Sequence, residues 1–205
     1  MNLAYKMIES PVGKLKLVAS DKALIAILWE KDNPRRVRLS ELIANDRHPV
    51  LVETERQLGE YFAGKRRTFS VALDLRGTRF QKDVWEALLA IPFGETRSYG
   101  QLAKQMGNPR ATRAVGAANG RNPVSIIVPC HRVIGSSGKL TGFAGGLEVK
   151  AHLLNLEAGG QASSREEWGT RSSVKNASTK RDRPAYDPAS LTVTSNQLEI
   201  PGIRS

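Results

Sequence analysis

Cysteine and long apolar runs are both scarce in this sequence. Among 205 residues there is one cysteine, Cys130, so the chain can form no intrachain disulfide and no multi-cysteine zinc site. Up to residue 75 the one histidine is His48, and we expect neither a metal nor a cofactor. No apolar run reaches the length of a membrane span, and no basic leader precedes a long apolar block. A lone thiol is typical of a reducing compartment, so we expect a cytoplasmic protein.

Acidic residues are absent from Thr96 to Leu147, although the whole chain carries both signs and a net charge of +11. That stretch contains seven basic residues: Arg97, Lys104, Arg110, Arg113, Arg121, Arg132 and Lys139. A field of one sign suits a polyanionic partner such as a nucleic acid. The alternative is a basic face that is simply solvated.

The first 75 residues predict a small α+β domain. Short strands are expected at 5–8, 15–19 and 24–29, with turn residues between them, and they would form a short antiparallel sheet. Residues 51–62 have helical spacing, and Gly64 would end that helix. Residues 69–75 alternate as a further strand would.

Residues 76–158 predict a helical domain. A capping box at Thr78 to Gln81 would open a first helix. A second capping box, at Ser98 to Gln101, would open a short second helix that runs through Met106. After a turn at Gly107, Asn108 would cap a third helix that begins at Pro109. Two short helices joined by such a turn predict a helix-turn-helix. Residues 159–205 are rich in small and charged residues and predict a disordered tail.

The third helix has two unlike faces. Its inward face would carry Ala111, Val115 and Ala118, and its outward face Arg110, Arg113 and Ala117. Gly116 and Gly120 each cost a helix about 1 kcal/mol relative to alanine, a cost that makes sense if a partner approaches the backbone closely. We interpret this face as a largely sequence-independent DNA contact. The alternative is an ordinary alanine-rich helix packed in the core.

The segment around Cys130 carries the candidate chemistry. Two prolines bracket an apolar run at 123–129, which predicts a buried strand or extended segment. His131 follows the thiol, and positive surroundings would lower the thiol pKa. With the carboxylate of Glu157, these residues make a nucleophile, a base and an orienting group. Neighbouring side chains of an extended segment point apart, so a water would bridge thiol and imidazole. The alternative is an inert buried cysteine.

Three motifs together resemble one family. Pro129-Cys-His-Arg-Val133, with Arg113-Ala-Val-Gly116 before it and Gly142-Phe-Ala-Gly-Gly146 after it, resembles the O6-alkylguanine-DNA alkyltransferase family, from about Phe80 to Glu157. The resemblance implies a ribonuclease H-like N-terminal domain and a winged-helix-like C-terminal one. It also implies direct-reversal DNA repair, a stoichiometric and irreversible transfer of an alkyl group from guanine O6 (or O4 of thymine) to a cysteine.

The resemblance also implies roles for single residues. Cys130 would accept the alkyl group, His131 would act as base through a water, and Glu157 would orient the imidazole. Tyr99 would hydrogen-bond guanine N3, and Asn122 would be the hinge beside the thiol.

Further positions would contact DNA or the base. Arg113 would fill the gap left by a flipped nucleotide, and Phe143 and Ala144 would belong to the loop that walls the base pocket. Ala144 stands where many members have serine, so a backbone N–H there would serve O6. Ser125 stands where some members have proline. The remaining expected DNA contacts are Arg110, Ala114, Gly116 and Arg121.

Three other functions are alternatives to alkyl transfer from DNA. A lesion-binding relative that marks damage without repairing it would not need Cys130. A Cys-His hydrolase would not need Arg113 or the basic field. A transcriptional regulator with an alkyl-sensing zinc domain would need more cysteines. We therefore expect a monomer that acts on double-stranded DNA containing alkylated guanine, near the nucleoid in a bacterium or in the nucleus of a eukaryote, and not at a membrane.

Overall fold

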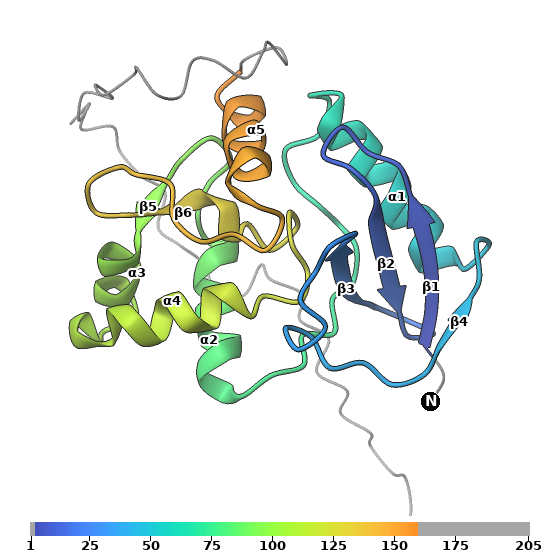
Figure 1. Ribbon diagram of the computed structural model, residues 1–205, viewed down its shortest axis with the longest axis horizontal. Helices are drawn as coiled ribbons and strands as arrows, with labels where there is room; N and C mark the ends of the chain where they lie inside the picture. Colours follow the sequence, from blue (N-terminus) through green and yellow to red (C-terminus); the bar gives the residue numbers. More distant parts are fainter. Residues whose placement is uncertain (1–2, 160–205) are drawn as a thin grey trace, which may run out of the picture. The chain divides into compact units, whose positions relative to one another are not determined.

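The N-terminal half is built on a four-stranded sheet. In the computed structural model, which describes residues 3–159, the strand order is β3-β2-β1-β4 (Figure 1). The three predicted strands are confirmed as β1 (Leu3–Ile8), β2 (Leu15–Ala19) and β3 (Leu24–Trp29), which pair antiparallel. β4 (Leu42–Ala44) pairs parallel to β1 and was not predicted. The predicted α+β class is therefore confirmed, with one added parallel strand.

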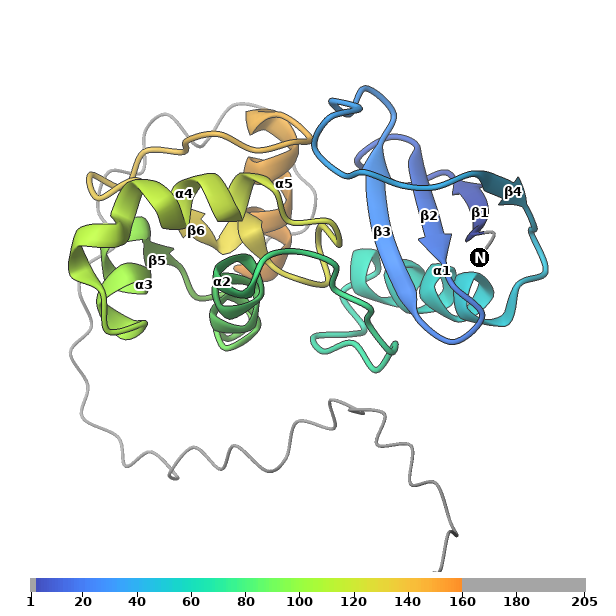
Figure 2. The ribbon, with the colours of Figure 1, turned by 90° about the horizontal axis from the view of Figure 1, so that it is seen from below.

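Helix α1 (Pro49–Phe62) covers one face of this sheet (Figure 2). It begins two residues before the predicted start because Pro49 occupies its first turn, where a missing N–H costs nothing. Leu51, Leu58 and Tyr61 point from α1 into the core and are almost fully buried. Gly64 follows the helix with φ of 70°, a left-handed conformation that suits glycine.

The strand predicted at 69–75 is wrong. Residues 72–74 make one bridge, in which Leu73 lies opposite Leu24. Further along the same strand, the N–H of Ile27 donates to the carbonyl of Pro123 at 2.9 Å. The free edge of β3 is thus divided between two segments far apart in sequence, which leaves no room for a longer ladder.

The C-terminal half is helical. It contains α2 (Arg79–Leu89), α3 (Tyr99–Gln105), α4 (Thr112–Gly120) and α5 (Leu147–Glu157). Both predicted capping boxes are confirmed, at the start of α2 and of α3. The indole of Trp85 on α2 donates to the carbonyl of Ala118 on α4 at 3.0 Å and ties the two helices together.

The third predicted helix is confirmed in a modified form. It starts as a 3₁₀ turn, η1 (Pro109–Ala111), before α4, and the side chain of Asn108 makes no capping hydrogen bond. Asn108 occupies the predicted N-cap position, with Pro109 in the first turn, but its side chain does not bond to the helix N-terminus. The short turn between α3 and α4 remains, so the helix-turn-helix arrangement stands.

Two short parallel strands hold the thiol segment beside the helices. β5 (Arg97–Ser98) pairs with β6 (Val133–Ile134), and η2 (Cys130–Arg132) precedes β6 directly. α5 packs on η2. Within residues 3–159 no helix is long and apolar enough to cross a membrane. The tail predicted to be disordered lies outside the described residues from 160 onward.

Candidate active site

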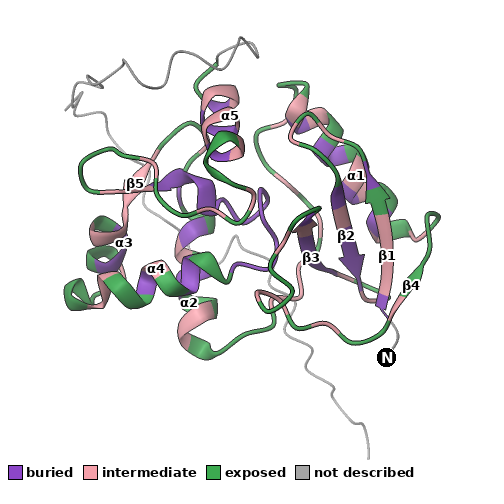
Figure 3. Ribbon diagram, viewed as in Figure 1, coloured by how far each residue is buried: buried purple, intermediate pink, exposed green. Residues whose placement is uncertain are grey.

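The residues before Cys130 are buried, as predicted, but they form a tight turn in place of the predicted strand or extended segment. The side chain of Asn122 accepts from the N–H of Val124 at 3.0 Å and donates to the carbonyl of Val128 at 2.7 Å. The N–H of Val128 also donates to the carbonyl of Val124. Ile126 takes φ of 74°, which is strained for a β-branched residue. Residues 122–133 are all buried, as the purple stretch in Figure 3 shows. This turn fixes the backbone that carries the thiol.

The Cys130 thiol is 4% exposed and starts η2. Burial raises its pKa above the usual range, although a hydrogen bond with Asn122 and the charges of Arg36 and Lys150 act in the opposite direction. The lowered thiol pKa predicted from the basic surroundings is therefore wrong for the resting protein. A buried thiol that rests protonated needs a base before it can act as a nucleophile.

His131 is completely buried in the next position. Its Nε2 lies 2.8 Å from Oε1 of Glu157. Burial lowers the pKa of His131, so the resting ring is neutral, and an ionised carboxylate can only accept. Nε2 must then carry the proton, and Nδ1 presents a lone pair. Nδ1 is buried and has no hydrogen-bond partner within residues 3–159, so it can take up a proton.

Glu157, at the end of α5, is the buried anion of the site. Arg132 donates to it through Nε at 2.7 Å and through Nη2 at 3.0 Å. The N–H of Gly94 donates at 3.2 Å, and the hydroxyl of Tyr61 at 2.8 Å. Burial by itself would raise the pKa of Glu157, but the hydrogen bonds from His131 and Arg132 lower it to about 2. Glu157 is therefore charged at neutral pH.

Lys150 supports the same site from α5. Its buried ammonium donates to the carbonyl of Val133 at 2.6 Å and to that of Thr141 at 2.8 Å. Burial lowers its pKa to about 8. Lys150 thereby joins the strand after the thiol to the loop that follows it.

Sequence reasoning missed three of these supports: Tyr61, Arg132 and Lys150. Arg132 was counted among the basic residues that face a polyanion, but it is 7% exposed and pairs with Glu157. Its place next to the Cys-His pair was the available signal. Arg97 is also paired, with Glu95 at 2.7 Å. The other basic residues of the acid-free stretch are exposed: Lys104, Arg110, Arg113, Arg121 and Lys139.

The predicted inward and outward faces of the third helix are found on α4 in most positions. Val115 and Ala118 are buried, and Ala111 is half-buried at the end of η1. The opposite face is exposed (Figure 3). This face carries Arg113, Ala114 and Ala117, and the exposed Arg110 and Arg121 flank the helix. Within the described residues no hydrogen bond or ion pair holds Arg113.

Tyr99 lies between α4 and the loop after β6. Its ring faces Gly116, where an added Cβ would meet the ring at 3.7 Å, an ordinary contact distance. The hydroxyl of Thr141 lies 3.3 Å from that of Tyr99. Tyr99 is thus brought close to the candidate DNA face, and the residue is half-buried there.

The loop around Phe143 lies against the thiol site and against the N-terminal sheet. The ring of Phe143 is 6.5 Å from that of His131 and 5.4 Å from that of Trp29 at the end of β3. Gly145 packs on the same indole, and a Cβ there would come within 2.8 Å of it. Ala144 between them is exposed, as a backbone donor to a ligand must be.

Arg36 adds a second link from the N-terminal half. It pairs with Asp32 and donates to the carbonyl of Asn122. The N-terminal half thereby supports both the turn before the thiol and the loop that faces it.

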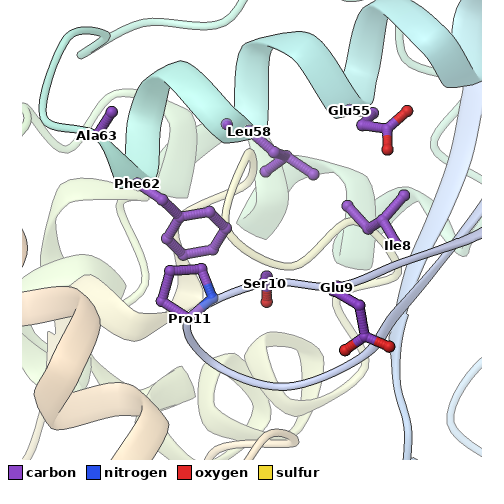
Figure 4. Close-up of a pocket in the computed structure, with 9 residues that line it drawn as sticks. Ile8, Glu9, Ser10, Pro11, Glu55, Leu58, Phe62 and Ala63 are labelled. Carbon is purple, nitrogen blue, oxygen red and sulfur yellow. The ribbon is translucent and has the colours of Figure 1, made fainter.

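A separate hollow lies between α1 and the β1–β2 turn (Figure 4). Its volume is about 390 Å³. Its lining includes Ile8, Pro11, Glu55 and Phe62, and none of the residues of the thiol site. No group of three or more histidine, cysteine or acidic side chains in residues 3–159 is arranged to hold a metal ion.

Two family models match the chain. The "6-O-methylguanine DNA methyltransferase, ribonuclease-like domain" matches residues 3–75, and the "6-O-methylguanine DNA methyltransferase, DNA binding domain" matches residues 79–159. Among curated proteins, the methylated-DNA--protein-cysteine methyltransferase of Methanosarcina acetivorans is 49% identical over 153 residues, 75% of this chain and 97% of that protein. The protein of the same name from Mycobacterium tuberculosis is 51% identical over 155 residues, 75% of this chain and 91% of that one.

A solved structure is also similar. The crystal structure of Mycobacterium tuberculosis OGT in complex with DNA has 46% sequence identity and a TM-score of 0.71 to this chain. The match covers 78% of this chain and 94% of that one.

Proposed function

The chain belongs to the 6-O-methylguanine DNA methyltransferase family, and we propose on this premise that it repairs DNA by moving an alkyl group from O6 of guanine to Cys130. The observation that carries the proposal is the relay beside the thiol. Cys130 is a buried free thiol, and the next residue, His131, offers the lone pair of Nδ1 while Glu157 holds its Nε2.

The relay can activate the thiol. The proton of Cys130 passes to Nδ1 of His131 through a bridging water, and the resulting imidazolium is stabilised by the charge of Glu157. The thiolate attacks the alkyl carbon, so that an S–C bond forms as the O6–C bond breaks. The electron pair of the broken bond stays with guanine, which takes up a proton that balances the one His131 received from Cys130 and remains in the DNA as a neutral, repaired base. The thioether cannot return to a thiol by this route, so each protein molecule acts once.

The base must leave the helix before a thiol buried this deeply can reach it. Base flipping costs a few kcal/mol, less for a weakened pair. We propose that Arg113 fills the vacated position in the duplex and that the exposed arginines beside it hold the phosphates. Tyr99 is suited to donate to guanine N3, and the N–H of Ala144 to O6. Asn122 maintains the turn that presents the thiol.

The proposed substrate is double-stranded DNA containing O6-alkylguanine, and the proposed acting species is a monomer. One thiol with one relay forms a complete site within a single chain, which supports the second point. The single unpaired cysteine also supports our proposal of an intracellular location, in the compartment that holds the DNA.

Stoichiometry tests this function most directly. Incubation with an excess of duplex carrying labelled O6-methylguanine should place one methyl group on each protein molecule, on the peptide that contains Cys130, as mass spectrometry can show. Cys130→Ala should abolish transfer and leave duplex binding nearly unchanged, because the phosphate contacts lie on α4. Sustained turnover, or binding of the lesion without any transfer by the wild type, would contradict the proposal.

A further inference from the structure

Tyr61 brings the N-terminal half into direct contact with the relay. It lies near the end of α1 and is 1% exposed. Its hydroxyl donates to Oε1 of Glu157 at 2.8 Å, across 96 positions of sequence. Oε1 is also the oxygen that His131 contacts through Nε2, at 2.8 Å. Tyr61 and His131 therefore share one acceptor atom, which also accepts from Nη2 of Arg132 at 3.0 Å.

The packing around the Tyr61 ring does not require a hydroxyl. The ring lies among three phenylalanine rings, at centroid distances of 5.4 Å from Phe62, 5.5 Å from Phe69 and 6.3 Å from Phe93. Phenylalanine would fill such an aromatic environment equally well. A buried phenol, in contrast, needs an acceptor. The hydroxyl is accounted for by Glu157 alone.

Tyr61 is fixed in the role of donor. Burial, together with the nearby charge of Glu157, raises the pKa of Tyr61 far above its ordinary value, so the hydroxyl keeps its proton. The other groups that face Glu157 are His131 and Arg132 from η2 and the N–H of Gly94. His131 is further influenced by the charges of Arg132 and Lys150.

We propose that Tyr61 is a positioning residue for alkyl transfer, and that its hydrogen bond to Glu157 limits how strongly this carboxylate holds the imidazolium of His131. This inference rests on the proposed function, since it concerns the proton that leaves Cys130. The carboxylate charge at Oε1 is divided among the donors that it accepts. A donor from α1 leaves less of it for the imidazolium.

The sign of the effect follows from this division. Without the hydroxyl, Oε1 attracts the Nε2 proton more strongly, and the pKa of His131 rises. Because the resting pair is a thiol beside a neutral ring, Nδ1 then takes up a proton from solvent at higher pH and can no longer accept the proton of Cys130. Tyr61→Phe should therefore shift the acid limb of the transfer rate toward higher pH, by about 0.5 pH unit, a fraction of a hydrogen bond to a charged group. A tyrosine at position 61 with fluorine beside its hydroxyl is a stronger donor of nearly the same shape and should shift the limb the other way.

The experiment compares single-turnover transfer from methylated duplex across pH for four proteins: wild type, Tyr61→Phe, fluorotyrosine at position 61 and Phe69→Leu. The last variant removes a ring that touches Tyr61 but makes no contact with Glu157, so it should lower the melting temperature without moving the pH midpoint. Opposite shifts for the two position-61 variants support the inference. A midpoint for Tyr61→Phe that coincides with that of Phe69→Leu, or moves downward, overturns it.

A second measurement is independent of repair. The chain has three histidines, so NMR titration of labelled histidine can follow the ring of His131 without any DNA. A pKa of His131 that is higher in Tyr61→Phe than in wild type supports the inference, and an equal or lower value overturns it. Absence of transfer by the wild type would refute the proposed function and leave this titration to decide the role of Tyr61.

Discussion

The thiol site and the outer face of α4 both use arginine, but in opposite ways. Arg132 is buried, pairs with Glu157 and donates to the carbonyl of Ile91 at 2.6 Å. Arg113 is exposed, and within the described residues nothing holds it. Almost every charged group at the thiol site is paired with another group of the protein, whereas Arg113 on α4 has no such partner within the described residues. Substitutions at the thiol site should therefore change the free energy of unfolding. Substitutions on the outer face of α4 should change the rate of repair on duplex DNA.

Glu157→Gln should produce the largest change in stability. It removes the charge that compensates Arg132 in a buried place, and breaking such a pair costs about 3–5 kcal/mol. Glu95→Gln, which alters an exposed pair with Arg97, is the matched control and should cost about 0–1 kcal/mol. Urea unfolding at pH 7 measures both. Equal losses for the two variants would mean that burial does not distinguish the two pairs.

The effect of Glu157→Gln on the free energy of unfolding should depend on pH. The pKa of Glu157 is lowered from 4.5 to about 2 in the folded protein, so its contribution is fully present above the unfolded value. It should be lost as pH falls from about 4.5 to about 2. The stability difference between wild type and Glu157→Gln should shrink over that range. A difference that stays constant there would contradict the ionised state of Glu157.

Arg113→Ala should slow repair of duplex DNA by the few kcal/mol that base flipping requires, while its free energy of unfolding changes by less than about 0.5 kcal/mol. Transfer from the free alkylated base should hardly change, because nothing has to be flipped. Arg113→Lys keeps the charge without the planar guanidinium and should rescue duplex repair only in part.

Single-turnover rates on duplex and free base measure the effect of Arg113, with Lys104→Ala as an exposed control on α3. Equal losses on the two substrates would point to a damaged pocket instead of a lost wedge.

Gly116→Ala should have the smallest effect of these variants, and it should raise stability where Glu157→Gln lowers it. Alanine stabilises a helix by about 1 kcal/mol over glycine, and the new Cβ meets Tyr99 at an ordinary 3.7 Å. Gly116 is half-buried beside Tyr99 and is an expected DNA contact, so the same methyl group should weaken duplex binding. Gly145→Ala is the contrasting control, because its Cβ would lie 2.8 Å from the ring of Trp29 and should destabilise by about 1–3 kcal/mol. Thermal unfolding measures the change in stability, and titration with duplex DNA measures the change in binding. A Gly116→Ala protein of lower stability than the wild type would contradict the prediction.

Features set by neighbours in sequence could be predicted well. The strands at 15–19 and 24–29 and the capping boxes at Thr78 and Ser98 follow from residues a few positions apart. The inward Val115 of α4 follows from helical spacing in the same way. The relay of Cys130, His131 and Glu157 was also predicted, through motifs that resemble a family, and its His131–Glu157 contact is present in the structure. The roles of Tyr99, Asn122 and the DNA-facing residues stay predictions.

What the sequence could not decide depends on contacts between distant segments. Residues 69–75 alternate like a strand, but β3 has to share its edge with Pro123. The run from Val124 to Val128 has strand composition, but the side chain of Asn122 folds it into a turn. The basic surroundings suggested a thiolate, but burial outweighs them and raises the thiol pKa. Tyr61 and Glu157 meet across 96 positions. Local patterns record which conformations a segment prefers, whereas desolvation and shared acceptors arise only once the chain has packed.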